Sequence, residues 1–227
     1  MGKVDFNSYG NDYNKIMEEQ HKKFGDISYY SEYKVKIIKD NIKNNKEPKI
    51  LEFGCGIGRN LKYLFDISVD SEVYGFDIST ESLKIAKNEN PKAIIIEDEK
   101  CLYKMQEKFD LIFVAGVYHH IEPSFRDKIT KNLRELLTKN GQLIIFEHNP
   151  YNPITRHLVN TCEFDSDAIL IKKNDLLELF TRNKFIVQSS GYTLFFPPKL
   201  KFFSFLEKYI KWIPLGGQYY AIFKKSI

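Results

Sequence analysis

The sequence predicts an α/β fold built on a doubly wound, mostly parallel β-sheet. Five short apolar runs follow one another from Lys49 to Phe146, each with the length of a strand buried on both faces: KILEF, EVYGF, KAIII, DLIFVAG and QLIIF. Helix-like segments separate the runs, as parallel neighbours require, because a crossover must return the chain to the starting edge. The carboxyl ends of the runs should meet at one edge, where such folds bind ligands.

Length and composition restrict the class of protein further. The 227 residues are 43% apolar and 28% charged, with a net charge of +4, which is typical of a globular domain and argues against a nucleic-acid substrate. The three cysteines lie far apart, so the sequence predicts neither disulfides nor a metal site. No apolar run approaches the ~20 residues that cross a bilayer, and the amino terminus shows no export signal. We therefore expect a cytoplasmic protein.

The amino-terminal part differs from the repeating core. Residues 1–47 are polar and lysine-rich, with a helical signal in Val35, Ile38 and Ile42, and we interpret them as a helical lid. Residues 48–227 would form the main domain, with insertions on the substrate side in 148–215.

Helices and further strands are predicted downstream. A helix should begin at Pro123 and stop before Gly141. Its apolar side would carry Phe125, Ile129, Leu133, Leu136 and Leu137. Another helix is expected near 175–181, and the strand-like runs FIVQSS and QYYAIF follow it.

The turn after the first apolar run is the most informative motif. It reads Glu52-Phe53-Gly54-Cys55-Gly56-Ile57-Gly58 and leads into a helix near Arg59. Glycines allow a sharp turn and a close approach of a ligand to backbone amides. A dinucleotide fingerprint, GxGxxG, would need glycine where Arg59 stands. The carboxylate of Glu52 is unfavourable near a phosphate and suits a cationic ligand.

These features resemble the class I S-adenosylmethionine-dependent methyltransferases, whose first motif is an acidic residue two positions before GxGxG. Further features follow in the family's order. Asp77 ends VYGFD, where the family's acid binds both ribose hydroxyls, and Asp98 with Leu102 resembles the adenine-contacting turn. The segments FDLIFVAGVYHHI and KNGQLII look like the fourth motif and the turn into the fifth strand.

The resemblance implies a Rossmann-like seven-stranded sheet with an antiparallel carboxyl-terminal strand, and S-adenosylmethionine as cofactor. An inert scaffold of the same fold is the alternative. The residues implied for cofactor binding lie on the glycine turn and after the following strands: Glu52, Gly54, Gly56, Gly58, Asp77, Ile78, Asp98, Glu99 and Ala115.

Histidines at the same edge are candidates for catalysis. A hydroxyl acceptor needs a base as it attacks the methyl group, and histidine has a suitable pKa. The candidates are His119, His120 and His148, each of which could instead cap or pack a helix. The polar connection after the fifth strand is long, as functional loops often are, although it could be a surface loop. We expect substrate contacts from Tyr118, Asn149, Tyr151 and Arg156.

The segment 199–213, KLKFFSFLEKYIKWI, is strongly apolar. As a helix it would show a narrow polar stripe and a broad apolar sector that something must cover. The sector could pack on the sheet, on the lid or on a second copy in a homodimer. It could instead lie in the surface of a membrane, on its inner face.

The expected activity is methyl transfer from S-adenosylmethionine to a small-molecule substrate. A looser resemblance of the carboxyl-terminal part to bacterial methyltransferases of polysaccharide and sugar pathways favours an oxygen of a sugar-like or phosphorylated acceptor. The alternatives are an N-methyltransferase of a small amine and a non-catalytic module that binds a membrane surface or a partner.

Overall fold

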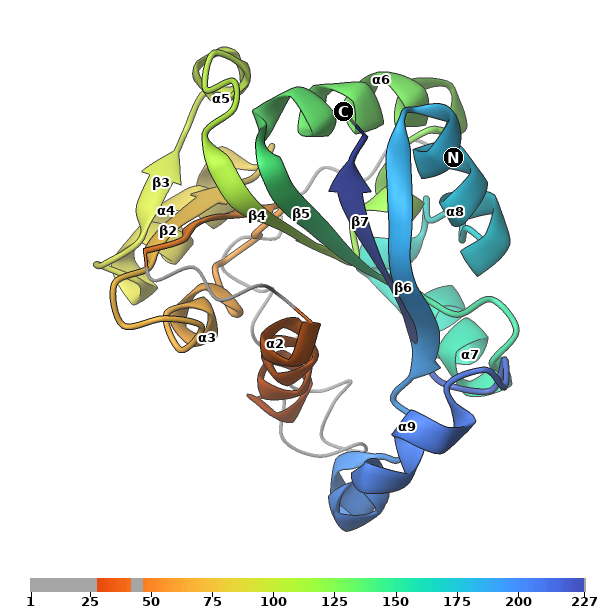
Figure 1. The fold of residues 1–227 in the computed structure, drawn as a ribbon. Helices are drawn as coiled ribbons and strands as arrows, with labels where there is room; N and C mark the ends of the chain where they lie inside the picture. The colour runs from red at the N-terminus through yellow and green to blue at the C-terminus, as the bar shows by residue number, and fades with distance from the viewer. Residues whose placement is uncertain (1–27, 42–46, 227) are drawn as a thin grey trace.

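A seven-stranded sheet with strand order β3-β2-β1-β4-β5-β7-β6 forms the centre of the molecule (Figure 1). The computed structural model describes residues 28–41 and 47–226. Strands β1 to β5 lie parallel, and β7 runs antiparallel to both β5 and β6, which confirms the predicted sheet. The strands are β1 (Lys49–Phe53), β2 (Glu72–Phe76), β3 (Ile94–Ile96), β4 (Phe109–Ala115), β5 (Leu137–His148), β6 (Phe185–Thr193) and β7 (Gln218–Lys225).

Helices cover both faces of the sheet, and each face has its own apolar core. On one face α2 (Ser28–Asn41), α3 (Leu61–Leu64) and α4 (Thr80–Glu89) bury side chains; on the other, α5 (Glu99–Tyr103), α6 (Pro123–Leu136) and α8 (Lys173–Arg182) do so. The remaining helical segments follow the carboxyl ends of β4, β5 and β6. They are η2 (Tyr118–His120), α7 (Pro153–Thr161), η3 (Glu163–Asp165), η4 (Pro198–Leu206) and α9 (Glu207–Ile210).

The helix predicted after Pro123 is present but shorter than expected. It ends at Leu136, and Leu137 adopts extended backbone angles and begins β5 opposite Phe109. Leu137 is fully buried in the strand, whereas Phe125 is 53% exposed instead of lying on a buried side. The two assignments to the apolar side of the helix were therefore wrong, because strand pairing with β4 overrides the helical spacing of Leu137.

Helix α2 accounts for part of the predicted amino-terminal helix. Val35 and Ile38 are buried in the core on the face shared with α3 and α4. Ser31 donates a hydrogen bond from Oγ to Oδ1 of Asn60, 2.7 Å away, and so joins α2 to the end of the glycine turn. Ile42 and the rest of the expected lid, residues 1–27 and 42–46, lie outside the described residues.

The segment 199–213 is not the single helix that its pattern predicts. The 3₁₀-helical segment η4 contains a non-helical residue at Leu200, and α9 spans only Glu207–Ile210. The expected stripe of Lys201, Ser204, Lys208 and Lys211 is therefore not formed along one helix axis. Within the described part of the chain, no helix has the length and apolarity to cross a membrane.

Candidate functional site

The expected site residues come together at one edge of the sheet. Strand β1 lies between β2 and β4, so the carboxyl ends of these parallel strands are neighbours. They bring the glycine turn, Asp77 and the η2 turn to the same edge. Strand β5 pairs with β4 and adds Glu147 and His148 beside η2.

The glycine turn has a backbone that side chains would disturb. Gly54 has φ +77°, and a Cβ there would lie 2.3 Å from Cγ2 of Val117. Gly56 has φ +52°, but a Cβ there would meet nothing within 4 Å. Gly58 is fixed from the other side, since Asn90 donates from Nδ2 to its carbonyl at 3.1 Å. The turn therefore leaves open space at Gly56, next to the backbone amides.

Glu52, two residues before the glycine turn, has a buried carboxylate. Its Oε1 accepts a hydrogen bond from Nδ2 of Asn60 at 2.6 Å, while its buried Oε2 has no hydrogen-bond partner among the described residues. Burial raises the pKa of Glu52 to about 8, although the Asn60 hydrogen bond and the charge of Lys34 act in the opposite direction. A buried acceptor of this kind is a place for a cationic or hydrogen-donating ligand.

Asp77 closes the other side of the glycine turn. Its carboxylate accepts the backbone N–H of Gly56 at 2.8 Å and that of Ser79 at 2.9 Å. Burial raises the pKa of Asp77, and these amide hydrogen bonds partly offset the shift. The next residue, Ile78, is a large apolar side chain that is 66% exposed.

The acids after β3 are placed differently from the other cofactor candidates. Asp98 caps α5, where its Oδ1 accepts the backbone N–H of Lys100 at 2.8 Å. Both Asp98 and Glu99 are exposed, whereas Ala115 at the end of β4 is half-buried. The carboxylate of Asp98 is thus engaged in helix capping, which is the usual role of aspartate at this position.

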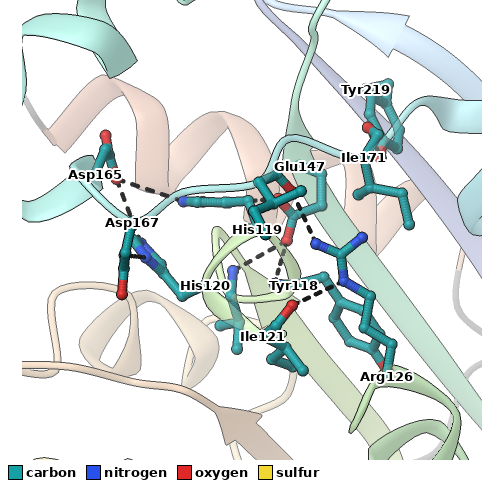
Figure 2. Close-up of polar contacts among 12 residues, drawn as sticks. Tyr118, His119, His120, Ile121, Arg126, Glu147, Asp165, Asp167, Ile171 and Tyr219 are labelled. Atoms are coloured by element: carbon teal, nitrogen blue, oxygen red, sulfur yellow. Dashed lines mark hydrogen bonds and ion pairs between the residues drawn. The ribbon is translucent and has the colours of Figure 1, made fainter. Parts of the chain in front are cut away.

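His119 and Glu147 form a buried ion pair at the junction of β4 and β5 (Figure 2). Nδ1 of His119 lies 2.7 Å from Oε2 of Glu147, and Oε1 accepts the backbone N–H groups of Val117 and Tyr118. Burial lowers the pKa of His119, but Glu147 and Asp165 outweigh it and raise the pKa to about 9. His119 is therefore cationic at neutral pH.

Asp165, the last residue of η3, and Asp167 extend this pair into a cluster (Figure 2). Oδ1 of Asp165 lies 3.5 Å from Nε2 of His119 and 3.3 Å from Nε2 of His120, and Asp167 lies 3.2 Å from Nδ1 of His120. His119, His120 and Asp165 offer three ligand atoms within 4.8 Å of one another and could hold a metal ion. Their nitrogen and oxygen atoms also satisfy each other as ion pairs.

His148 differs from the two other histidines. It is half-buried, its ring centroid is 5.0 Å from that of His119, and the structure shows no hydrogen bond from its side chain to another described residue. Burial and the charge of His119 lower the pKa of His148 to about 4. At neutral pH its imidazole is therefore uncharged.

Two of the four expected substrate residues have structural roles instead. Tyr118 is fully buried, and its hydroxyl lies 2.8 Å from Oγ1 of Thr130. Asn149 is also fully buried; its side-chain amide donates to the carbonyls of Pro214 and Gly216, and its Oδ1 accepts the N–H of Tyr151. These polar groups form hydrogen bonds with other groups of the protein.

The two other candidates, Tyr151 and Arg156, are exposed around α7. Sequence reasoning missed Lys34 on α2, which is half-buried and interacts electrostatically with Glu52 and Glu147. Burial lowers the pKa of Lys34, and the two carboxylates partly offset this. No sequence signal separates Lys34 from the other lysines of the amino-terminal part.

A family model matches the part of the chain that carries the glycine turn. Residues 51–143 match the family model described as a methyltransferase domain. This segment is a methyltransferase domain, and the whole chain has the fold of the class I S-adenosylmethionine-dependent methyltransferases. The matched region includes the glycine turn, Asp77 and the η2 turn, whereas Glu147, His148 and the loop with Asp165 lie beyond it.

Relatives of the methyltransferase cover most of its length. An uncharacterised methyltransferase of Alkaliphilus oremlandii is 23% identical over 188 residues, 77% of this chain and 85% of that protein. A Thermotoga maritima S-adenosylmethionine-dependent methyltransferase has the same fold, with a TM-score of 0.69 at 17% identity over 97% of this chain and 98% of that one. A third structure is phosphoethanolamine N-methyltransferase 2 of Haemonchus contortus, solved with phosphomonomethylethanolamine and S-adenosylhomocysteine. It has a TM-score of 0.67 at 16% identity, over 99% of this chain and 61% of that one.

The site of the methyltransferase fits its cofactor. S-adenosylmethionine carries an ammonium and a sulfonium, and the buried Oε2 of Glu52 is an acceptor without a partner among the described residues. The open space at Gly56 allows a ligand to approach the turn. The exposed Ile78 offers an apolar surface next to Asp77.

Proposed function

We propose that the enzyme methylates a small acceptor, with an oxygen of a sugar-like or phosphorylated compound as the favoured target. When bound, S-adenosylmethionine supplies a methyl group that is already electrophilic because it is attached to a sulfonium. The side chains of this chain then have to align the two reactants and accept a proton.

The glycine turn and its neighbours bind the cofactor in this proposal. Glu52 faces the methionine part, the carboxylate of Asp77 accepts from the ribose hydroxyls, and Ile78 packs on the adenine. The amide hydrogen bonds to Asp77 support this role, because they fix the carboxylate in place and leave lone pairs free. Asp98, Glu99 and Ala115 would contact the adenine end and the methyl donor from the rim.

His148 is the proposed base, and its environment is the observation that carries the proposal. Both nitrogens of His119 face carboxylates, and His120 lies between Asp165 and Asp167. His148 is half-buried and shows no such contact within the described ranges. Of the three candidate histidines it is the one without a carboxylate partner among the described residues, and its lowered pKa makes it a weaker base than an ordinary histidine. His119 and His120 position the loop around it in this proposal.

Basic side chains that could pair with an anionic acceptor lie on α2 and α7. Lys34 on α2 and the cationic His119 interact electrostatically with His148, as do the carboxylates of Asp165 and Glu147, and Arg156 is exposed on α7. A phosphate or carboxylate of the acceptor could pair with Lys34 or Arg156. In this proposal α2 acts as a lid that brings Lys34 over the reacting groups.

An N-methyltransferase of a small amine is the alternative. The Haemonchus protein of the same fold is described as an N-methyltransferase, and the carboxylate of Asp165 could pair with a cationic amine. An amine acceptor can attack as the free base, so it depends less on His148 than a hydroxyl does.

Turnover with an acceptor panel tests the proposal. The enzyme would be incubated with S-adenosylmethionine and either hydroxylated sugars and sugar phosphates or small amines, and S-adenosylhomocysteine would be quantified by mass spectrometry. We expect turnover with a hydroxylated acceptor and a loss of roughly 10²-fold or more in His148→Gln. His157→Gln, an exposed position on α7, is the control. Turnover of amines alone would contradict the preference for oxygen.

A further inference from the structure

We propose that the segment between β6 and β7 docks the enzyme onto an anionic lipid surface. This segment exposes large apolar side chains. It includes the 3₁₀ segment η4, none of whose residues is buried. We call the following residues the aromatic patch: Phe202 (65% exposed), Phe205 (60%), Tyr209 (64%), Trp212 (73%) and Leu215 (60%). The sheet and α2 leave these five side chains uncovered, so they do not belong to the folded core.

The exposed charges of this segment are all basic. Lys199, Lys201, Lys208 and Lys211 are exposed in the same segment. Its one acidic residue, Glu207, is 4% exposed and turned inward, where it accepts the backbone N–H groups of Leu194 and Phe195. The surface offered to a partner is therefore apolar and cationic, with no exposed carboxylate in the segment.

Exposed aromatic and lysine side chains favour a lipid surface over a second copy of the chain or a nucleic acid as the partner of the aromatic patch. Tryptophan and tyrosine prefer the boundary between headgroups and acyl chains, and lysines extend their ammonium groups to the headgroups. A symmetric contact between two copies would place two sets of lysines against each other, which like-charge repulsion disfavours. Single-stranded nucleic acid also binds aromatic and basic side chains, but Leu215 has no ring on which a base can stack.

The aromatic patch lies at the same edge of the sheet as the candidate site. Strand β6 runs parallel to β5, because both pair antiparallel with β7, so η4 begins at the edge where β5 ends. The hydroxyl of Tyr33 on α2 donates to Glu207, which connects the segment to the helix that carries Lys34. In Figure 1, η4 and α9 project from the body of the molecule beside α2. A lipid surface bound to the aromatic patch would therefore face the edge of the sheet that carries the candidate site.

The chain carries its own reporter for the test, since Trp212 is its single tryptophan. Full-length enzyme would be mixed with vesicles of phosphatidylglycerol and phosphatidylcholine, or of phosphatidylcholine alone. We expect a blue shift of Trp212 emission and co-sedimentation with the anionic vesicles, both weakened by high salt. Absence of both signals with anionic vesicles would overturn the proposal.

Matched variants locate the contact. Lys201→Glu with Lys208→Glu should weaken vesicle binding about tenfold or more, and Phe202→Ser with Phe205→Ser should abolish the blue shift while Trp212 remains. Lys92→Glu with Lys128→Glu makes the same change of charge at exposed sites elsewhere, and Val69→Ser removes an apolar side chain that is 97% exposed. Circular dichroism checks that each variant is folded.

Three results would contradict the lipid assignment. One is equal binding by the patch variants and their controls. Another is a dimer in analytical ultracentrifugation that the Phe202→Ser, Phe205→Ser variant converts to a monomer, which would show that a second copy covers the patch. The third is a Trp212 shift with a single-stranded RNA oligonucleotide but not with vesicles.

Discussion

Glu147 holds His119 at 2.7 Å through Oε2 and holds the backbone of the η2 turn through Oε1. Both side chains are almost fully buried, at 1% and 2% exposure. One carboxylate at the end of β5 therefore fixes the turn after β4, where the expected catalytic residues lie. The stability of this junction and the geometry of the site depend on the same ion pair.

Glu147→Gln should destabilise the protein by about 3 kcal/mol, because a buried pair that loses one charge leaves the other uncompensated. The amide oxygen of glutamine can still accept hydrogen bonds from the η2 amides. The decrease in unfolding free energy is therefore due mainly to the missing charge. Urea unfolding measures the effect. Glu135→Gln removes the exposed partner of Arg134 and should cost less than about 1 kcal/mol.

The effect of Glu147→Gln should also depend on pH. The pKa of His119 is raised to about 9 in the folded state, above the ordinary value of about 6.5. A raised histidine pKa contributes stability that is fully present below pH ~6.5 and is lost as the pH rises through about 9. The difference in unfolding free energy between wild type and variant should shrink between pH 6.5 and 9. A constant difference would contradict a charged His119.

His148 should remain neutral at physiological pH. Its pKa is lowered to about 4 by burial and by the charge of His119, so its imidazole should not titrate between pH 6 and 8. Nitrogen-15 NMR of the imidazole rings, assigned with His148→Gln, measures this directly. Protonation of His148 near pH 6.5 would mean that its surroundings are more polar than the structure shows.

Gly56→Ala should affect cofactor binding more than folding. The φ of +52° costs a side chain about 1–2 kcal/mol, and the new methyl group would project into the space next to the turn. We expect at least a tenfold rise in the dissociation constant of S-adenosylmethionine. In Gly54→Ala the methyl group would lie 2.3 Å from Val117, so that variant should lose more stability. Equal cofactor affinity in Gly56→Ala and wild type would place the cofactor elsewhere.

Binding of the cofactor should release a proton from Glu52. With a pKa of about 8, Glu52 is mostly protonated at pH 7, and a nearby cation favours the ionised carboxylate. Calorimetry in buffers of different ionisation enthalpy should show the release of nearly one proton at pH 7, decreasing above pH 8. Glu52→Gln should lack this release. The same release in both proteins would exclude Glu52 as its source.

The sequence was sufficient for the sheet, because the five apolar runs and their order leave few alternative topologies. The sequence was less reliable where pairing between strands competes with a local helical pattern. Leu137 has helical spacing with Leu133, but it pairs with Phe109 and begins β5. The 199–213 segment has a broad apolar sector, but the structure divides it between η4 and α9, and no residue of η4 is fully buried.

The site was predicted in outline and corrected in detail. The sequence predicted that the histidines follow the ends of strands. The contact between His120 and Asp167 was not predicted, because the two residues are 47 positions apart in the sequence and meet only in the folded chain. Tyr118 was expected to face a substrate, yet its ring is part of the core, a direction that sequence spacing does not specify. Lys34 was missed because its proximity to Glu52 and Glu147 depends on how α2 packs.

Isothermal titration with S-adenosylmethionine, S-adenosylhomocysteine and a nicotinamide dinucleotide tests the central claim most directly. The wild-type chain should bind the first two compounds and not the third. Asp77→Asn should bind them at least tenfold more weakly, because a carboxylate accepts from a ribose diol more strongly than an amide does. A chain that binds the nicotinamide dinucleotide and ignores S-adenosylmethionine would contradict the account.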